Sequence, residues 1–320
     1  RVPWSRTADN VIASDVIVPS QREAQDGKFL YVDVLDYGSI ARAVVEEGIT
    51  QVVHNSSLLS AVGEKKPLKA LQVNLIGFQN MLEIARMYDL RIFAPSTIAT
   101  FGPSSELVDT PDLTIMRPTT IYGITKLHLE LLGEYYKNKF GIDFRTVRFP
   151  GIISSQAQPG GGTTDWAVSI FYDALRKGRY ECFLKEDTRL PMMHMSDCVR
   201  ATIGLLEADA RLLKQRTYNV TALSFSPKDL ASEIAKHIPD FEMSYAPDYR
   251  QDIADSWPRS LDDSNARQDW AWEHQMGIED IVSSMLFDLG KKTFAETDQM
   301  RTGTSKAEKL VTPKVYMARN

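Results

Sequence analysis

Short apolar runs alternate with amphipathic helical patterns along the first half of this sequence. The runs are Asn10 to Val18, Phe29 to Asp36, Thr50 to Ser57, Arg91 to Ala99 and Asp143 to Ile153. Buried parallel strands are short and apolar, and consecutive parallel strands need a crossover, which is usually a helix. The alternation therefore predicts an α/β fold, a Rossmann-like doubly wound parallel sheet with helices on both faces.

A change of pattern near residue 153 divides the chain. Residues 1–153 are predicted to form a dinucleotide-binding domain, with ligands outside the carboxyl ends of the strands. Residues 154–290 open with a Gly-, Ser- and Thr-rich loop and then mix elements, which indicates a smaller C-terminal substrate-binding lobe with returning sheet elements. Residues 291–320 show little hydrophobic periodicity, so we expect a mobile tail there.

Composition argues against several functions. The formal net charge is −5 and no basic block stands out before the last thirty residues, so we expect no nucleic-acid partner. Only Cys182 and Cys198 occur, which favours a reducing compartment over a disulfide framework. No apolar run approaches the roughly 20 residues of a membrane span. Five scattered histidines and two cysteines show no metal-ligand spacing, so we expect neither a membrane nor a metal.

A tyrosine and a lysine one helical turn apart carry the clearest chemical signal. Tyr122 and Lys126 share one face of a predicted helix. An ammonium nearby favours the phenolate and lowers the tyrosine pKa, which would make a general base. Ser96 and Thr97 end the preceding strand, where a hydroxyl would hold a substrate oxygen. The alternatives are a surface lysine beside a half-buried tyrosine, and hydroxyls that only cap the strand exit.

Two aspartates follow the first two predicted strands. Asp15 is placed to accept a hydrogen bond from a ribose 2′-hydroxyl, which would favour NAD over NADP. Asp33 and Val34 would bracket an adenine ring. The alternatives are a turn aspartate at Asp15 and a solvated strand-end aspartate at Asp33.

Several longer motifs place these residues in a familiar pattern. The sequence contains "SSLLSAVGE", "FAPSTIATFGP", "TIYGITKLHLELLGEYY", "FRTVRFPGIIS", "QPGGGTTDWA" and "SWPRSLDDSNARQDW", which span Ser56 to Trp270. The chain thereby resembles the extended short-chain dehydrogenase/reductases. More narrowly, it resembles the L-threonine 3-dehydrogenases of that family, and most closely the animal type, which is mitochondrial.

The resemblance implies roles for the residues that match it. Tyr122 would be the catalytic base, Lys126 would bind the nicotinamide ribose, and Thr97, with Ser96 beside it, would steady the reacting oxygen. The reaction would be NAD-dependent oxidation of L-threonine to L-2-amino-3-ketobutyrate. The resemblance also implies further binding residues. Pro150 and Ile152 would line the nicotinamide, and the substrate would contact Ser60, Gly162, Thr164 and Asp165 besides Thr97 and Tyr122. The alternative for the glycine-rich loop is that it is only a turn.

The resemblance further implies a partner and leaves two other functions open. The predicted helices at Lys69–Met87 and Thr119–Tyr136 would form the interface of a homodimer, and the compartment would be mitochondrial, with the cytoplasm as the alternative. A nucleotide-sugar epimerase or dehydratase of the same superfamily would share the Tyr–Lys pair. A non-catalytic relic would fold and pair with intact subunits without turnover.

The amino-terminal sequence departs from the family pattern. The family begins with a strand and a Gly-x-x-Gly-x-x-Gly turn, whereas this sequence begins "RVPWSRTADNVIASDV" and its first glycine is Gly27. The family's first strand lies centrally in the sheet, so its absence would leave two strand edges facing a gap. We therefore expect weak NAD binding and slow turnover.

Overall fold

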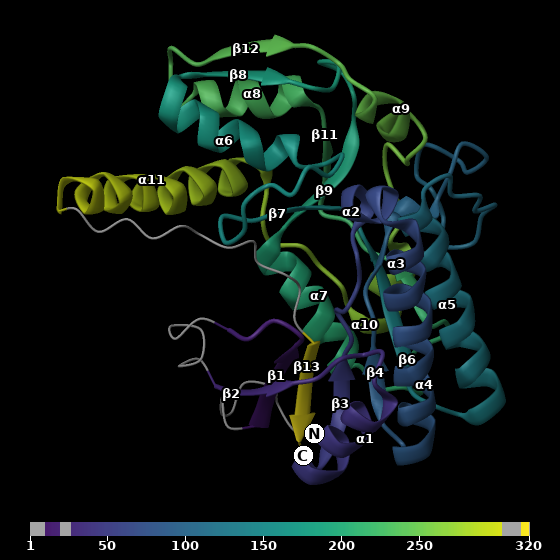
Figure 1. The fold of residues 1–320 in the computed structure, drawn as a ribbon. Coiled ribbons are helices and arrows are strands. Elements are labelled where there is room, and N and C mark those ends of the chain that lie inside the picture. The colour runs from purple at the N-terminus through teal and green to yellow at the C-terminus, as the bar shows by residue number, and fades with distance from the viewer. Residues whose placement is uncertain (1–9, 20–26, 303–314, 320) are drawn as a thin grey trace.

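The computed structural model describes residues 10–19, 27–302 and 315–319. A central sheet with helices on its faces forms the lower part in Figure 1, and smaller sheets with further helices lie above it. The predicted Rossmann-like sheet is confirmed. None of the helices in the described residues is long and apolar enough to cross a membrane.

The large sheet has eight strands, and seven of them follow the order β10-β6-β4-β3-β13-β1-β2, with β5 paired to β6. Every pairing in it is parallel except the two made by β13. Its strands are β1 (Val11–Asp15), β2 (Lys28–Tyr31), β3 (Ile49–Val53), β4 (Arg91–Phe93), β5 (Ser96–Thr97), β6 (Phe144–Phe149), β10 (Thr217–Asn219) and β13 (Val315–Arg319).

Helices pack on both faces of this sheet because its strands are apolar on both sides. Val52 packs with residues of α1, α4 and α5, whereas its neighbour Val53 packs with residues of α7 and α10. In the same way, Ile92 packs with residues of α1, α4 and α5, and Phe93 packs with residues of α7 and α10. Successive side chains of a strand point to opposite faces, so a continuous apolar run is buried on both. These helices are α1 (Tyr37–Glu47), α4 (Gly77–Tyr88), α5 (Ile121–Phe140), α7 (Met195–Glu207) and α10 (Ser264–Trp270).

The second part of the molecule is built on two small sheets. One has the order β11-β9-β7 and the other pairs β12 with β8. Their strands are β7 (Gly151–Ile153), β8 (Arg179–Cys182), β9 (Leu190–His194), β11 (Leu223–Phe225) and β12 (Glu242–Tyr245). The helices are α6 (Trp166–Lys177), α8 (Pro227–Ala235), α9 (Arg250–Asp255) and α11 (Ile278–Thr302). Fully buried Trp166 belongs to the core cluster that joins these elements.

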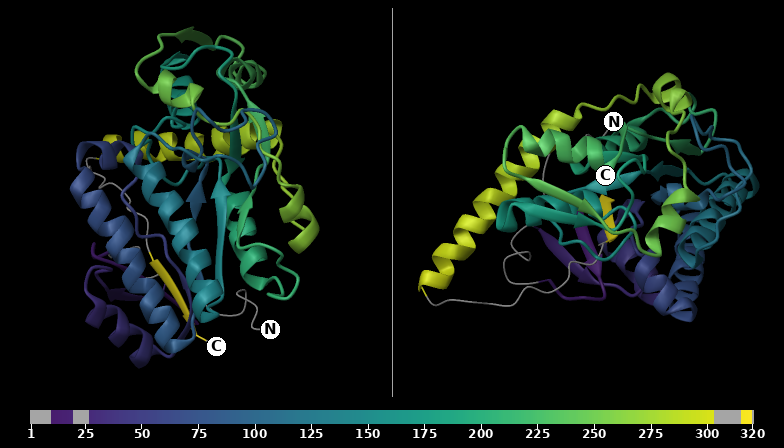
Figure 2. Two further views of the ribbon diagram at one scale, coloured as in Figure 1. Left: turned by 90° about the vertical axis from the view of Figure 1, so that its right-hand side faces the viewer. Right: turned by 90° about the horizontal axis from the view of Figure 1, so that it is seen from above.

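The helix predicted across Lys69–Met87 is interrupted. It consists of α3 (Pro67–Leu71), the π-helical turn η3 (Gln72–Ile76) and α4, and α2 (Ser60–Lys65) precedes it. A π-helical turn holds an extra residue and is common at functional sites. Figure 2 shows the long helices α4 and α5 running side by side along one face of the sheet.

Strand β13 is the main departure from the expected fold. It lies between β1 and β3 and pairs antiparallel with both, as Figures 1 and 2 show. The expectation that two strand edges face a gap was wrong, because β13 pairs with both edges. Residues 291–320 were expected to form a mobile tail, and the described part of this segment holds the end of α11 and β13.

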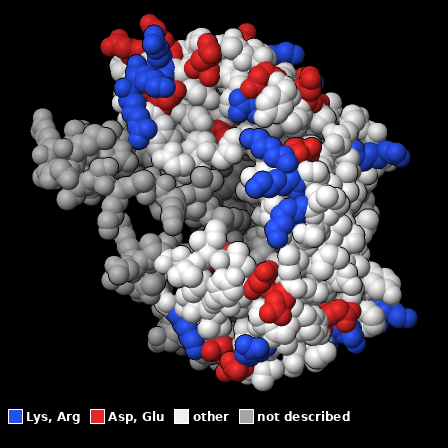
Figure 3. All heavy atoms as spheres, in the orientation of Figure 1, with Lys and Arg blue, Asp and Glu red and all other residues white. Residues whose placement is uncertain are grey.

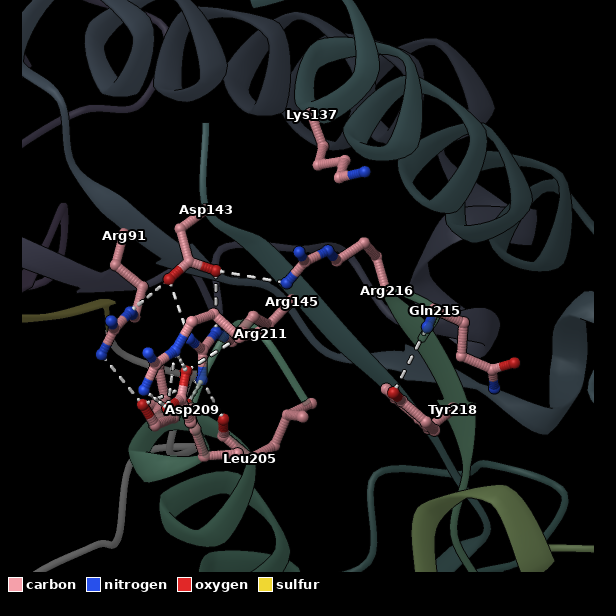
Figure 4. Close-up of polar contacts among 12 residues, drawn as sticks. Arg91, Lys137, Asp143, Arg145, Leu205, Asp209, Arg211, Gln215, Arg216 and Tyr218 are labelled. Carbon is pink, nitrogen blue, oxygen red and sulfur yellow. Dashed lines mark hydrogen bonds and ion pairs between the residues drawn. The ribbon is translucent and has the colours of Figure 1, made fainter. Parts of the chain in front are cut away.

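A buried charge cluster ties α7 to the amino end of β6 (Figure 4). Arg145 is fully buried and donates to Asp143 over 2.8 Å and to the carbonyl of Ala208, just after α7, over 2.7 Å. Arg91 donates to the same carboxylate over 2.6 Å. Burial alone would raise the pKa of Asp143, but the two guanidinium groups outweigh it and hold that pKa below its usual value.

We expect Gly133→Ala to destabilise the protein. A Cβ at Gly133 on α5 would lie 2.3 Å from the ring of Phe144, so the helix would have to move away from the sheet. Overpacking of this kind costs about 1–3 kcal/mol, which exceeds the roughly 1 kcal/mol that alanine gains over glycine in a helix. The measurement is the free energy of unfolding from denaturant titration.

The matched control is Gly290→Ala on α11. A Cβ there meets no atom within 4 Å, so alanine should stabilise by up to about 1 kcal/mol. Equal changes in both variants would contradict the close approach of α5 to β6.

Candidate active site

The start of helix α5 is fixed against the carboxyl edge of the sheet. The hydroxyl of Thr120 caps the helix by accepting from the amide of Gly123 over 3.1 Å. Gly123 lies so close to the preceding segment that a Cβ there would be 2.1 Å from the carbonyl oxygen of Ala99. This contact needs a glycine, and it places Tyr122 beside the end of β5.

Thr97 and Tyr122 meet at this edge. Thr97 ends β5, and its hydroxyl accepts from the amide of Ala99 over 3.2 Å at the start of the 3₁₀ turn η4 (Ile98–Thr100). The same side chain hydrogen-bonds to the Tyr122 side chain. Burial raises the pKa of Tyr122 to about 12, and the bond to Thr97 opposes this only in part. The lowered pKa expected from the Tyr–Lys spacing was wrong, because burial favours the neutral phenol more strongly than the bond to Thr97 favours the phenolate.

Lys126 lies one turn further along α5 and is also buried. Its ammonium donates to the carbonyl of Pro95 over 2.7 Å and lies 5.8 Å from the ring centroid of Tyr122. Burial lowers the pKa of Lys126 to about 8, although the charge of Glu130 acts in the opposite direction. The lysine therefore sits near the tyrosine, as the one-turn spacing predicts.

A buried ion pair continues the same helix face. Glu130, four residues after Lys126, pairs with Arg148 of β6 over 2.8 Å, and both side chains are almost fully buried. Ser96 donates to the same carboxylate. Sequence reasoning missed Glu130 and Arg148, although the four-residue spacing from Tyr122 through Lys126 to Glu130 was a signal. The Ser96 hydroxyl is therefore hydrogen-bonded to Glu130, whereas the Thr97 hydroxyl is hydrogen-bonded to Tyr122.

His54 directly follows β3 and is buried near Lys126. It is 2% exposed, its ring stacks at 5.5 Å from Phe78, and its Nδ1 has no hydrogen-bond partner among the described residues. Burial, and then the charge of Lys126, lower the pKa of His54 to about 3. The imidazole is therefore neutral in the fold.

The loop that leads to Ser60 is held by the π-helical turn. Asn74 of η3 accepts from the amide of Leu58 over 2.8 Å and donates back to its carbonyl over 3.1 Å. The Asn74 amide group also donates to Thr125 of α5 over 3.0 Å. Ser60 begins α2, so its position at the start of this short helix is fixed relative to α5.

The glycine-rich loop is closed by its own aspartate. The carboxylate of Asp165 accepts from the amides of Gly161 and Gly162 over 2.7 and 2.9 Å. Thr164 lies against Gly151, where a Cβ would be 2.8 Å from the threonine methyl group. The structure thus brings Thr164 next to the Pro150–Ile152 segment, while Asp165 is occupied within the loop.

The remaining predicted positions lie at the carboxyl ends of β1 and β2. Asp15 ends β1 and accepts from the amide of Ile17 over 3.0 Å. Asp33 accepts from the amide of Leu35 over 2.9 Å. Val34 is buried against Gly77 at the start of α4. Both carboxylates are therefore at the same edge of the sheet as Tyr122.

These residues fit only part of a dinucleotide. Tyr122 and Lys126 suit the nicotinamide ribose, and Asp15 suits the other ribose. Basic side chains gather beside a hollow of the surface in Figure 3. Lys65 at the end of α2, Lys66 after it and Lys69 in α3 are exposed. The described residues contain no Gly-x-x-Gly-x-x-Gly turn for the pyrophosphate, and β13 enters this edge in the opposite direction to the other strands. They also contain no cluster of metal-ligating side chains.

The fold and the site define a class of protein. A doubly wound sheet with a Tyr–Lys pair and a threonine hydroxyl at its carboxyl edge is the arrangement of a nicotinamide-dependent short-chain oxidoreductase. A family model described as "NAD dependent epimerase/dehydratase family" matches residues 5–221. The chain belongs to this family, and membership implies a nicotinamide cofactor.

Individual relatives are more specific. The mitochondrial L-threonine 3-dehydrogenase of Bos taurus is 52% identical over 279 residues, which cover 87% of this chain and 75% of the relative. The structure of L-threonine dehydrogenase from Phytophthora infestans is similar with a TM-score of 0.85 at 57% identity, covering 87% of this chain and 90% of that one. The enzyme from Clostridium difficile gives a TM-score of 0.86 at 44% identity, with 88% and 89% covered. The resemblance to the L-threonine 3-dehydrogenases is thereby confirmed.

We expect the buried neutral His54 to make stability depend on pH. Its pKa is about 3 in the fold and 6.5 in its ordinary state, so between these values the unfolded chain binds one more proton. Stability is therefore full above about pH 6.5 and falls as the pH drops below it, by up to about 1.4 kcal/mol per pH unit. Unfolding free energies from urea titrations at several pH values measure this.

His54→Gln is the control, since glutamine does not titrate. The stability difference between the wild-type protein and this variant should shrink by about 2 kcal/mol between pH 7 and pH 5. A difference that stays constant over this range would show that the pKa of His54 is the same in the folded and the unfolded chain.

Proposed function

We propose that this chain is an NAD-dependent L-threonine 3-dehydrogenase that oxidises L-threonine to L-2-amino-3-ketobutyrate. One observation carries the proposal: Tyr122 lies between a hydrogen-bonded threonine hydroxyl and a buried lysine at the edge where this fold binds its ligands. The names of the 52% identical relatives support the substrate.

Tyr122 would take the proton of the substrate β-hydroxyl. Thr97 would hold the same oxygen, because its side chain already hydrogen-bonds to Tyr122. Lys126 would bind the nicotinamide ribose and favour the phenolate, since its buried ammonium lies 5.8 Å from the centre of the Tyr122 ring. Bound nicotinamide would supply the hydride acceptor. The role of the protein is then to orient the β-hydroxyl and to remove its proton.

The other positions would bind the two ligands. Asp15 would accept from the adenosine ribose and favour NAD over NADP, and Asp33 with Val34 would bracket the adenine. Ser96 would support the site through Glu130, and Pro150 and Ile152 would line the nicotinamide. Ser60, Gly162, Thr164 and Asp165 would surround the substrate. Residues 1–153 would thus bind the cofactor and residues 154–290 the substrate.

We expect Tyr122→Phe to abolish threonine oxidation. Removing a positioned general base typically costs 10²- to 10⁴-fold in rate. The assay is NADH formation at 340 nm with L-threonine and excess NAD, and isothermal titration with NAD separates binding from turnover. A base with a pKa near 12 is scarce at neutral pH, so the wild-type rate should rise with pH.

Tyr249→Phe is the matched control, because that tyrosine is exposed and lies outside α4 and α5. It should keep the wild-type rate. Threonine oxidation that survives in Tyr122→Phe would overturn the proposed base. Turnover of a nucleotide sugar would instead identify an epimerase or dehydratase, and a folded protein without either activity would identify a relic.

We also propose a homodimer that pairs through α4 and α5, and a mitochondrial location, for which the names of the animal relatives are the support. Ile124, Leu131 and Tyr135 form an exposed stripe on α5, and Leu68 and Ile76 are exposed on the neighbouring α3 and η3. Exposed apolar stripes of this kind are typical of interfaces.

Leu131→Glu should therefore convert a dimer into a monomer in light scattering, because it places a charge in the contact. Leu212→Glu is the control, since Leu212 is equally exposed but lies outside these helices. A monomer in the wild-type protein would contradict the dimer.

A further inference from the structure

The carboxylate of Glu130 is hydrogen-bonded to two strands of the sheet. Its Oε1 accepts from the hydroxyl of Ser96 on β5 and, over 2.9 Å, from Nε of Arg148 on β6. Its Oε2 accepts from Nη2 of Arg148 over 2.8 Å. Glu130 itself belongs to α5 and is 1% exposed. This buried carboxylate therefore has a fixed position between the helix that carries the Tyr–Lys pair and the strands beneath it.

The same carboxylate lies one helical turn beyond Lys126. Residues four apart share one face of a helix, so the charges of Lys126 and Glu130 lie on the same side of α5. The Lys126 ammonium donates to the carbonyl of Pro95 over 2.7 Å, which is a neutral acceptor. Burial lowers the pKa of Lys126 to about 8, and the charge of Glu130 acts against this burial. The spacing thus places a fixed negative charge near a lysine that burial brings close to losing its proton.

The other titratable groups around this lysine do not supply a buried negative charge. Tyr122 is neutral below its pKa of about 12, and His54 is neutral above its pKa of about 3. Arg148 is a cation that pairs with Glu130 itself. The charged residues of α2, α3 and the turn between them, which pack on α5, are exposed, so water screens them: Glu64, Lys65, Lys66 and Lys69.

Ser96 connects Glu130 to the hydroxyl beside the proposed base. Thr97 is the next residue of the two-residue strand β5, and its side chain hydrogen-bonds to Tyr122. Because Ser96 and Thr97 are neighbours on one strand, the bond between Ser96 and Glu130 restrains the position of the Thr97 hydroxyl. Glu130 is thus coupled to Thr97 and to Lys126, which both act on Tyr122.

We infer that Glu130 is a positioning residue of this site. Its charge keeps Lys126 protonated, and its bond to Ser96 holds Thr97 in place. The inference rests on the proposed function, since it concerns the same proton transfer. A charged lysine donates hydrogen bonds and favours the phenolate, whereas a neutral amine carries no charge to stabilise it. Removal of the Glu130 charge should therefore slow the removal of the substrate proton.

Glu130→Gln tests the electrostatic part. Glutamine has nearly the same shape and keeps an acceptor oxygen for Ser96, but it carries no charge. We expect the pKa of Lys126 to fall below its wild-type value of about 8. NMR of protein that contains isotope-labelled lysine measures this pKa, and Lys126→Met assigns the signal. An unchanged pKa would overturn the inference whether or not the protein oxidises L-threonine, because the titration needs no turnover.

The rate of NADH formation with L-threonine gives a second readout. We expect kcat of Glu130→Gln to fall by at least about tenfold with little change in KM, because the charge acts on the proton transfer and not on substrate binding. The loss should grow as the pH rises from about 6 to about 8, since the variant loses the charge of Lys126 at a lower pH than the wild-type protein does. A loss that is the same at every pH would reflect disturbed packing and would overturn the inference.

A second variant separates the charge from folding. Glu130→Gln leaves the buried guanidinium of Arg148 without its partner, which is destabilising. Glu130→Gln combined with Arg148→Met removes both charges, and protein interiors tolerate that change better. The lowered pKa of Lys126 should persist in the double variant. A return of that pKa to about 8 would assign the effect to the unpaired Arg148 and would contradict the role of Glu130.

Ser96→Ala tests the other contact, because it removes the bond to β5 and leaves the carboxylate charged. We expect kcat to fall while the pKa of Lys126 stays near its wild-type value. Wild-type kcat in this variant would contradict the restraint on Thr97. The matched control is Glu134→Gln, one turn further along α5, where the carboxylate accepts from Thr217 over 2.6 Å. It should change neither kcat nor the pKa of Lys126.

Discussion

The ion pair between Glu130 and Arg148 links the helix that carries the Tyr–Lys pair to strand β6 beneath it. Both side chains are nearly inaccessible to water, and the guanidinium also donates to the carbonyl of Asp112 over 2.8 Å. A buried charge without its partner costs several kcal/mol, on the order of 3–5. The pair therefore fixes the rotation of α5 on the sheet, and with it the direction in which Tyr122 and Lys126 point. The close approach of Gly133 to Phe144 and of Gly123 to Ala99 fixes the distance between helix and sheet.

The pKa values of the side chains at this site differ from their ordinary values, because the packing of α5 on the sheet keeps these groups away from water. Lys126 and His54 are buried and Tyr122 is partly buried, and burial shifts the pKa of each group toward its neutral form. A charged ligand that enters the site would change these pKa values, because little water is present there to screen its charge. The neutral histidine also leaves Lys126 without a second positive charge beside it.

The sequence predicted the sheet well because the signals for it are local. Each strand is a short apolar run, and each crossover has the helical period, so the fold class followed from the order of the runs. The Tyr–Lys pair could be found for the same reason, since four-residue spacing fixes proximity within one helix. Thr97 was found by its place at a strand end. The distinction between Thr97 and Ser96 was not available, because it depends on Glu130, which reaches Ser96 from another element. Asn74 was missed because a π-helical turn leaves no clear mark in the apolar periodicity.

Local periodicity alone thus determined the class of fold, the helix that carries Tyr122 and Lys126, and the residues at the carboxyl ends of the strands. The tertiary structure decided which partners these residues have, because hydrogen bonds and burial depend on segments far apart in the chain. The raised pKa of Tyr122 is one example, since spacing indicates a neighbouring charge but not the depth of burial. Strand β13 is the other. A five-residue segment has no preferred partner by itself, and only the two buried edges of β1 and β3 specify where it binds and in which direction.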